Sequence, residues 1–272
     1  MSSATFDLSG RVAIVTGASE GMGLASAQLF AASGARLVVT ARTKDKIEAV
    51  AEDLNSRHGH CGTVAVAVAG DLGDKAHLRS LVETAVECFG ALTTLLCSPA
   101  IRPWLGSSID TPDDVFDEQL LYVLKSRFWL SSMAIPHMIA AGTGSLIYIG
   151  SGSVFEATGE RSVNCIARAG EWQMMKNFAA EFGKYNVRAN TIAPGMVESS
   201  GSRTLFESEE GARRIASLPL RRGGRTDEIA NAAAFLASDA SSFTTGAVIP
   251  VDGGRLLHAV DSMLLKSEGR ET

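Results

Sequence analysis

The chain has 272 residues, of which 46% are hydrophobic and 20% charged, and its formal net charge is −5. This apolar share can bury a full core, so disordered and low-complexity proteins are excluded, and the 27 glycines follow no collagen period. The acidic balance argues against a nucleic-acid-binding surface, because phosphate contacts need clustered Lys and Arg. The basic cluster at Arg221, Arg222 and Arg225 is short and broken by glycines.

Cysteine and histidine usage predicts a reducing compartment and no metal site. The cysteines form no C-x-x-C pair, so free thiols in the cytoplasm are expected rather than disulfides or a zinc site. No apolar run approaches the roughly 18 residues of a membrane helix, and residues 1–10 lack the basic and apolar regions of a signal peptide. We therefore expect a cytoplasmic protein that binds no membrane. The thiols are Cys61, Cys88, Cys97 and Cys165, and the histidines without metal-ligand spacing are His58, His60, His77 and His258.

Short β-branched runs alternate along the chain with longer amphipathic stretches. Apolar strands separated by helix-length segments must be buried and parallel. The pattern predicts an α/β fold, a Rossmann-type doubly wound parallel sheet of about seven strands with helices on both faces, in one domain over 1–272. Ligands bind such sheets beyond the carboxyl ends of the strands. The expected strands are 11–16, 36–40, 63–69, 92–97, 145–150, 187–192 and 247–251, and the expected helices are near 21–33, 44–58, 74–90, 112–141 (loosened at Pro136), 163–185 and 226–238 (with Thr226 as N-cap).

A glycine-rich segment, TGASEGMG at 16–23, joins the first predicted strand to the first helix. One glycine permits the tight turn, a second lets a pyrophosphate approach the positive helix N-terminus, and a third allows close packing of helix and strand. The alternative is an ordinary βα turn, but the position between strand and helix favours a dinucleotide site. The candidate cofactor-binding residues here are Gly17, Ser19, Gly21, Met22 and Gly23.

The end of the second strand indicates which dinucleotide is bound. A carboxylate there would bind the ribose of NAD, whereas arginine accommodates the 2′-phosphate of NADP. This chain has Arg42 and no carboxylate, so NADP(H) is favoured over NAD(H), although Glu20 would repel a phosphate if it pointed inward. Arg42 as a solvated loop cation remains an alternative. Asp71 follows the third strand and would accept from the adenine amino group, or cap the next helix.

These residues, in this order, resemble the short-chain dehydrogenase/reductase family from Leu8 to about Arg255. Segment 70–72 is similar to the adenine site of the family, 188–195 to its sixth strand and nicotinamide loop, and 251–254 to its last strand. The resemblance implies an NAD(P)(H)-dependent oxidoreductase acting on a carbonyl or alcohol substrate. It also implies further cofactor contacts at Leu72, Ser98, Pro194, Gly195, Val197 and Ser199.

The catalytic residues implied by the resemblance are incomplete in this sequence. Family members use a Ser after the fifth strand, a Tyr-x-x-x-Lys pair that handles the proton and the nicotinamide ribose, and an Asn on the preceding helix. Ser151 matches the Ser, but Asn164 and Arg168 stand at the Tyr and Lys positions and Val123 at the Asn position. Asn164 cannot release a proton near neutral pH, and Arg168 can contact ribose or a substrate carboxylate but cannot relay protons.

Other residues offer weak substitutes for the missing acid. Arg168 and Glu171 could pair, and the simplest interpretation is an ion pair on the surface, worth little. Tyr148 lies within the fifth strand and Tyr122 beside Val123, and neither stands out as a proton donor. Cys165 would need a lowered thiol pKa, and His137 reads as a packing or interface residue.

Three functions remain open from the sequence. The first is an NADP(H)-dependent reductase or dehydrogenase with an altered proton path, in which water, Ser151 or the substrate supplies the proton. The second is a non-redox enzyme, and the third a catalytically inactive nucleotide-binding protein. A substrate lid is expected at about 199–222, with Trp104 and Leu105 as an apolar wall. A homo-oligomer, a dimer or tetramer, is implied by the resemblance, and the apolar tail after Arg255 could dock on a neighbour.

Overall fold

The structure is a computed structural model that describes residues 6–59, 62–98, 101, 103–155 and 161–257. Its centre is a seven-stranded sheet in the order β3-β2-β1-β4-β5-β6-β9, and every strand pair is parallel. This confirms the predicted fold class. The strands are β1 (Val12–Thr16), β2 (Arg36–Thr40), β3 (Ala65–Ala67), β4 (Thr94–Cys97), β5 (Gly144–Ile149), β6 (Val187–Pro194) and β9 (Val248–Val251).

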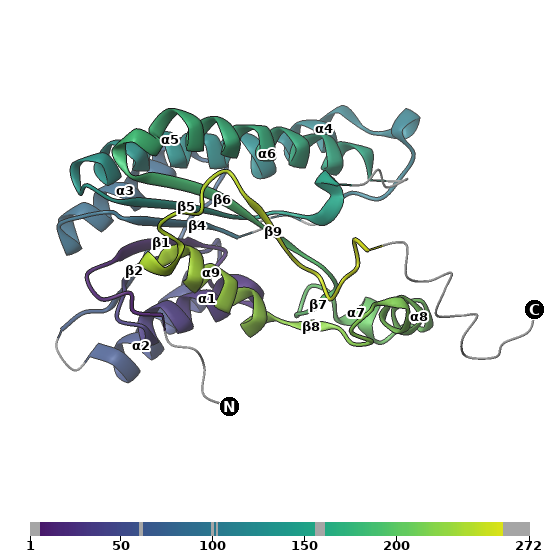
Figure 1. The fold of residues 1–272 in the computed structure, drawn as a ribbon, viewed down its shortest axis with the longest axis horizontal. Helices are drawn as coiled ribbons and strands as arrows, with labels where there is room; N and C mark the ends of the chain where they lie inside the picture. The colour runs from purple at the N-terminus through teal and green to yellow at the C-terminus, as the bar shows by residue number, and fades with distance from the viewer. Residues whose placement is uncertain (1–5, 60–61, 99–100, 102, 156–160, 258–272) are drawn as a thin grey trace, which may run out of the picture.

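Helices cover both faces of the sheet (Figure 1). The layer on one face consists of α1 (Gly21–Ala32), α2 (Lys44–His58) and α9 (Thr226–Ala237). The opposite layer consists of α3 (Lys75–Phe89), α4 (Asp113–Leu120), α5 (Ser126–Ala140) and α6 (Ser162–Phe182).

Burial on both faces explains why the strands are apolar along their whole length. All five residues of β1 are buried. Side chains alternate across a strand, so Ala13 and Val15 pack with α1 and α9, while Val12 and Ile14 pack with α3 and α5. No polar face is left on such a strand, as the sequence pattern indicated.

Three sequence-based boundaries are wrong in detail. The helix expected over 112–141 is continuous through Pro136, and its irregularity lies earlier, in a π-helical turn, η3 (Leu121–Lys125), between α4 and α5. The N-cap of α9 is Arg225 rather than Thr226, because Glu228 accepts from the Arg225 backbone N–H at 2.8 Å. The third strand covers only 65–67 of the expected 63–69.

The segment after β6 leaves the sheet at its carboxyl end and projects beyond it (Figure 1). The strands β7 (Val197–Glu198) and β8 (Gly224–Arg225) pair as a two-stranded ribbon. The helices α7 (Arg203–Phe206) and α8 (Glu209–Ser217) lie between these strands in the sequence. This is the region expected to form a lid. Most of the apolar tail, from 258 onward, lies outside the described residues. Within the described ranges, no helix is both long and apolar enough to cross a membrane.

The packing of α1 on β1 depends on Gly23, and this can be tested. A Cβ at this position would overlap the carbonyl oxygen of Gly17. We expect Gly23→Ala to lower the free energy of unfolding by about 1–3 kcal/mol through overpacking, although alanine favours helices. The measurement is urea unfolding followed by circular dichroism. Gly59→Ala is the control, because its φ is −80° and the new Cβ meets only the Asn55 Cβ at 3.8 Å. An equal loss in both variants would contradict the prediction.

Candidate active site

The glycine loop has the backbone geometry of an anion-binding turn. Gly17 and Gly21 have φ angles of +62° and +59°, which favour glycine. Helix α1 starts at Gly21, its N-cap Glu20 makes no side-chain cap hydrogen bond, and its first turn contains no acidic residue. The first backbone N–H groups of a helix have no intrahelical partner and carry partial positive charge. The residues present therefore fit a pyrophosphate at this helix end, with Ser19 and Met22 flanking the loop.

Glu20 is bound to the segment after β7. Its carboxylate accepts a hydrogen bond from the Ser200 hydroxyl at 2.8 Å, so it joins the glycine loop to the start of segment 199–222. Arg42 is exposed just after β2 and lies close enough to Tyr122 to lower the pKa of its phenol by its charge, although the hydrogen bond to Asp71 raises that pKa more. Glu20, which the sequence raised as an objection to a 2′-phosphate, is thus bound to Ser200.

Asp71 is held by protein groups after β3. Its Oδ1 accepts from the Gly73 backbone N–H at 2.6 Å and from the Tyr122 hydroxyl at 2.8 Å. The alternative of Asp71 as a helix N-cap is wrong, because Asp74 caps α3. Leu72 is half-buried beside the core. Ser98 is buried after β4, and its backbone N–H donates to Thr16 Oγ1 at 3.0 Å. These groups follow β3 and β4, whose carboxyl ends lie at the same edge of the parallel sheet.

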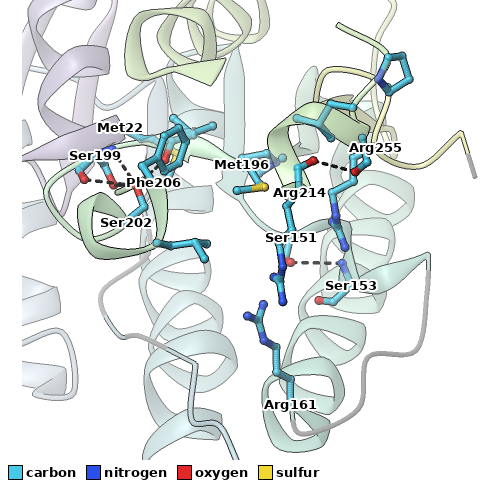
Figure 2. Close-up of a pocket in the computed structure, with 18 of the residues that line it drawn as sticks. Met22, Ser151, Ser153, Arg161, Met196, Ser199, Ser202, Phe206, Arg214 and Arg255 are labelled. Atoms are coloured by element: carbon cyan, nitrogen blue, oxygen red, sulfur yellow. Dashed lines mark hydrogen bonds between the residues drawn. The ribbon is translucent and has the colours of Figure 1, made fainter. Parts of the chain in front are cut away.

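A pocket of about 570 Å³ lies beyond β5 and β6. It brings together residues that are far apart in the sequence: one from the glycine loop, several from the segment after β6, and two of the three predicted catalytic residues. Figure 2 shows this pocket and the elements around it. The sequence-predicted residues that line it are Met22, Ser151, Asn164, Pro194, Gly195, Val197 and Ser199.

Ser151 and Asn164 present polar atoms to the pocket. Ser151 follows β5 in an extended conformation, and its Oγ accepts from the Ser153 backbone N–H at 3.2 Å, which leaves its own proton available to a ligand (Figure 2). Asn164 is buried on the first turn of α6, and its Nδ2 donates to Gln119 Oε1 at 3.1 Å. Neither group is an acid near neutral pH. Together they can orient a carbonyl or hydroxyl oxygen.

Arg168 is held beneath the pocket and does not line it. It is 5% exposed, and its Nη1 donates to Glu171 Oε2 at 2.9 Å and to the Ile149 carbonyl at 3.2 Å. Arg127 donates to the same two oxygens. The interpretation of Arg168 and Glu171 as a surface pair is therefore wrong. Burial lowers the pKa of Arg168 to about 10, so the guanidinium stays charged at neutral pH.

No tyrosine occupies the place of a general acid in this pocket. Tyr148 is fully buried in β5, where its hydroxyl lies 2.7 Å from Ser131 Oγ, and desolvation raises the pKa of its phenol well above the usual value. Tyr122 donates its hydroxyl hydrogen to Asp71 after β3, and Tyr185 is exposed. These three are all the tyrosines of the chain. Among the described residues that line the pocket there is also no lysine, cysteine or histidine.

Several pocket residues were not found from the sequence. Ser153, Arg161 and Arg255 line the pocket, and Gln119 and Arg127 support Asn164 and Arg168. The signal for Arg255 was its place directly after the last strand motif, at the ligand-binding edge; the others had none. Trp104 and Leu105, expected as an apolar wall, do not line the pocket. Of the apolar residues in the expected lid, Leu205, Phe206 and Leu218 line it and Ile215 does not.

The chain is similar to known proteins over most of its length. Residues 17–255 match the family model described as enoyl-(acyl carrier protein) reductase. The dehydrogenase/reductase SDR family member 4 of Bos taurus is 33% identical over 92% of this chain and 89% of that protein. The trans-4-hydroxycyclohexanecarboxylate dehydrogenase of Sinomonas cyclohexanicum is 35% identical over 90% of this chain and 92% of that protein.

A solved structure has the same fold. It comes from Beutenbergia cavernae, contains NADP at low occupancy and belongs to a protein proposed to be an NAD(P)-dependent gluconate 5-dehydrogenase. The sequences are 28% identical, the TM-score is 0.85, and the match covers 93% of this chain and 100% of that chain.

The buried charges around Glu171 predict a large stability effect. Removing one charge of a buried group leaves its partners uncompensated, so we expect Glu171→Gln to cost about 3–5 kcal/mol of unfolding free energy. Glu181→Gln on the exposed face of the same helix is the control and should change stability by less than about 0.5 kcal/mol. Urea unfolding of both variants checks this. Similar stabilities for the two variants would show that the arginines are not held by this carboxylate.

Proposed function

Because the chain belongs to the short-chain dehydrogenase/reductase family, we propose that it is an NAD(P)(H)-dependent oxidoreductase that interconverts an alcohol and a carbonyl compound. One observation carries the proposal: a single pocket joins Met22 of the glycine loop, the segment 194–199 and the side chains of Ser151 and Asn164. A cofactor lying from the N-terminus of α1 into this pocket would meet a substrate beside Ser151.

The protein's part in the reaction is binding and orientation. The bound cofactor would accept or supply the hydride. The α1 N-terminus would hold the pyrophosphate, and Pro194, Gly195, Val197 and Ser199 would surround the nicotinamide. Ser151 and Asn164 would bind the substrate oxygen, as donors to the charge that develops there. With no tyrosine in the pocket, the proton would come from water, from Ser151 or from the substrate.

The proposed roles at the family Tyr and Lys positions differ from the usual ones. Asn164 positions the substrate oxygen in place of a phenol. Arg168 acts as a positioning residue, because its guanidinium holds the Ile149 carbonyl, two residues before Ser151. This is why we propose an atypical active site.

A second function is favoured by the same absence of an acid. If hydride transfer does not occur, the cleft serves a non-redox enzyme or a catalytically inactive nucleotide-binding protein. The observation that favours this second function is that Arg168 is buried and does not line the pocket. The measured behaviour with reduced nicotinamide decides between the two functions, as described below.

We further propose a lid at 199–222, a cytoplasmic location and a homo-oligomer of two or four chains. The lid is supported by Leu205, Phe206 and Leu218, which close one side of the pocket. Cys88, Cys97 and Cys165 are free thiols, as a reducing compartment requires. The outer face of α5 and α6 carries a groove lined by Ile135, Pro136, Ile139, Phe178 and Phe182, and this supports assembly through these helices.

Cofactor titration tests the proposed function. We expect NADPH to bind with a change in nicotinamide fluorescence, and the reduced-nicotinamide absorbance to fall with at least one member of a panel of ketones and aldehydes. Binding without oxidation across the panel would favour the non-redox alternative. If neither NADPH nor NADH binds, the cleft is no longer a cofactor site.

Arg42 gives a test of cofactor preference. A hydrogen bond to a charged group contributes about 1.5–3 kcal/mol, so Arg42→Ala should raise the Kd of NADPH by roughly 10- to 100-fold and leave that of NADH unchanged. Lys46→Ala, an exposed cation on the next helix, is the control. Equal losses for the two cofactors in Arg42→Ala would contradict a 2′-phosphate contact.

Placing the family's Tyr and Lys at positions 164 and 168 tests whether their absence limits catalysis. General acid catalysis typically contributes about 10²–10⁴-fold, so Asn164→Tyr combined with Arg168→Lys should raise carbonyl reductase kcat/KM by about 10²-fold or more. The matched control is Asn164→Phe with Arg168→Lys, which adds the ring without the hydroxyl. A gain of the same size in the phenylalanine variant, or no gain in a folded tyrosine variant, would refute this interpretation of the two positions.

A further inference from the structure

Three arginines from separate parts of the chain line the pocket. Arg161 is the N-cap residue of α6, Arg214 lies on α8, and Arg255 follows β9. In the described part of the pocket wall there is no Asp or Glu. The protein as a whole is acidic, with a net charge of −5, so this is a local concentration of positive charge in the place where a substrate would bind.

Arg255 lies against the backbone next to Ser151. A Cβ built on Gly152 would be 2.9 Å from Arg255 Nη1, so the guanidinium packs closely against this glycine. The turn that carries it is fixed by Asp252, whose carboxylate accepts from the backbone N–H groups of Gly254 and Leu256 at 2.9 and 3.0 Å. Arg255 is half-buried, so it is not an ordinary solvated surface cation.

Ser153 adds a polar atom beside Arg255. Its side chain lines the pocket, and its Oγ is buried and makes no hydrogen bond within the described structure. A buried hydroxyl normally has a partner, so this one can serve a bound ligand. Figure 2 shows Arg255 and Ser153 side by side along the same wall as Ser151.

Arg161 and Arg214 extend toward one another across the pocket (Figure 2). Arg161 is half-buried and lies at the positive end of the 21-residue helix α6, three residues before Asn164. Arg214 is exposed on α8 and pairs with Glu210 one turn earlier. Such exposed pairs are weak, so Arg214 can exchange this partner for a ligand, whereas Arg161 and Arg255 belong to the fixed part of the pocket.

We propose that the substrate carries an oxyanion, a carboxylate or a phosphate, which Arg161 and Arg255 bind beside Ser151 and over which Arg214 closes. This deepens the proposed function and rests on it, because it names the class of alcohol or carbonyl compound that the enzyme takes. The apolar residues Leu205, Phe206, Leu218 and Leu257 line the rest of the pocket and suit a hydrocarbon body. Arginine binds both anions with paired hydrogen bonds.

Binding measurements test the substrate class without depending on turnover. The probes are cyclohexanecarboxylate, its methyl ester and cyclohexyl phosphate, measured by calorimetry against the full-length protein with NADPH and without it. We expect each anion to bind at least 10-fold more tightly than the ester. The anion that binds more tightly shows whether the substrate carries a carboxylate or a phosphate. Binding of the ester as tightly as the acid would overturn the proposal.

The variants Arg255→Met and Arg161→Met should each reduce the preference for the anions over the ester at least 10-fold. Arg255→Lys should retain part of this preference. Arg213→Met is the matched control, because Arg213 neighbours Arg214 on α8 but does not line the pocket. An unchanged preference in both pocket variants, or an equal loss in Arg213→Met, would refute the site. If Arg255→Met does not fold, as judged by thermal unfolding, Arg161→Met decides.

The two proposals fail separately. If anions bind in preference to the ester but no hydride transfer occurs with any hydroxy or keto acid, the proposed redox function is wrong and the ligand class stands. If neutral ketones are reduced and the acids are neither bound nor reduced in preference, the redox function stands and the arginine site is wrong.

Discussion

The carboxylate of Glu171 is the constraint on which the catalytic end of the molecule depends. It is 1% exposed and accepts hydrogen bonds from both Arg127 and Arg168. Two buried guanidinium groups this close would repel one another strongly without it. Both arginines also donate to the carbonyl of Ile149, the last residue of β5. Through the two arginines, the carboxylate therefore holds the end of β5 in place and so positions Ser151.

The same carboxylate restricts the residue that connects β5 to Ser151. A Cβ on Gly150 would lie 3.0 Å from Glu171 Oε1 and 2.6 Å from Thr191 Cγ2, so a side chain there would displace the ion cluster or β6. The family resemblance implied a ribose contact at the Lys position, and it did not predict that Arg168 contacts Glu171 and the Ile149 carbonyl. Here the cation at position 168 supports the end of β5, and the wall of the pocket includes Ser151, Asn164 and the three arginines but not Arg168.

The fold and the glycine loop could be predicted from the sequence because their signals are local. Apolar runs of strand length and glycines at a strand–helix junction constrain the chain within about ten residues. The burial of Arg168 could not be predicted this way, since spacing alone does not show which helix face is buried, and Arg127, which shares the Glu171 carboxylate with it, is 41 residues away in the sequence. The same reason hides Arg161 and Arg255, which line one pocket because α6 begins and β9 ends at the same edge of the sheet. The hydrogen bond from Tyr122, in the π-helical turn, to Asp71 was not predicted either, because it joins residues 51 positions apart.

The hydrogen bond between Ser200 and Glu20 links two regions that are 180 residues apart in sequence. One end belongs to the loop that would hold a nucleotide, and the other to the segment over the substrate. A ligand that breaks this hydrogen bond at the nucleotide loop changes the binding free energy of a ligand under the lid. By thermodynamic reciprocity the effect is equal in the opposite direction. A hydrogen bond to a charged group contributes about 1.5–3 kcal/mol, and the exposure of this one places it at the lower end of that range. The communication between nucleotide and substrate through this contact is therefore limited to roughly a tenfold change in affinity, enough to favour an order of addition but not to enforce one.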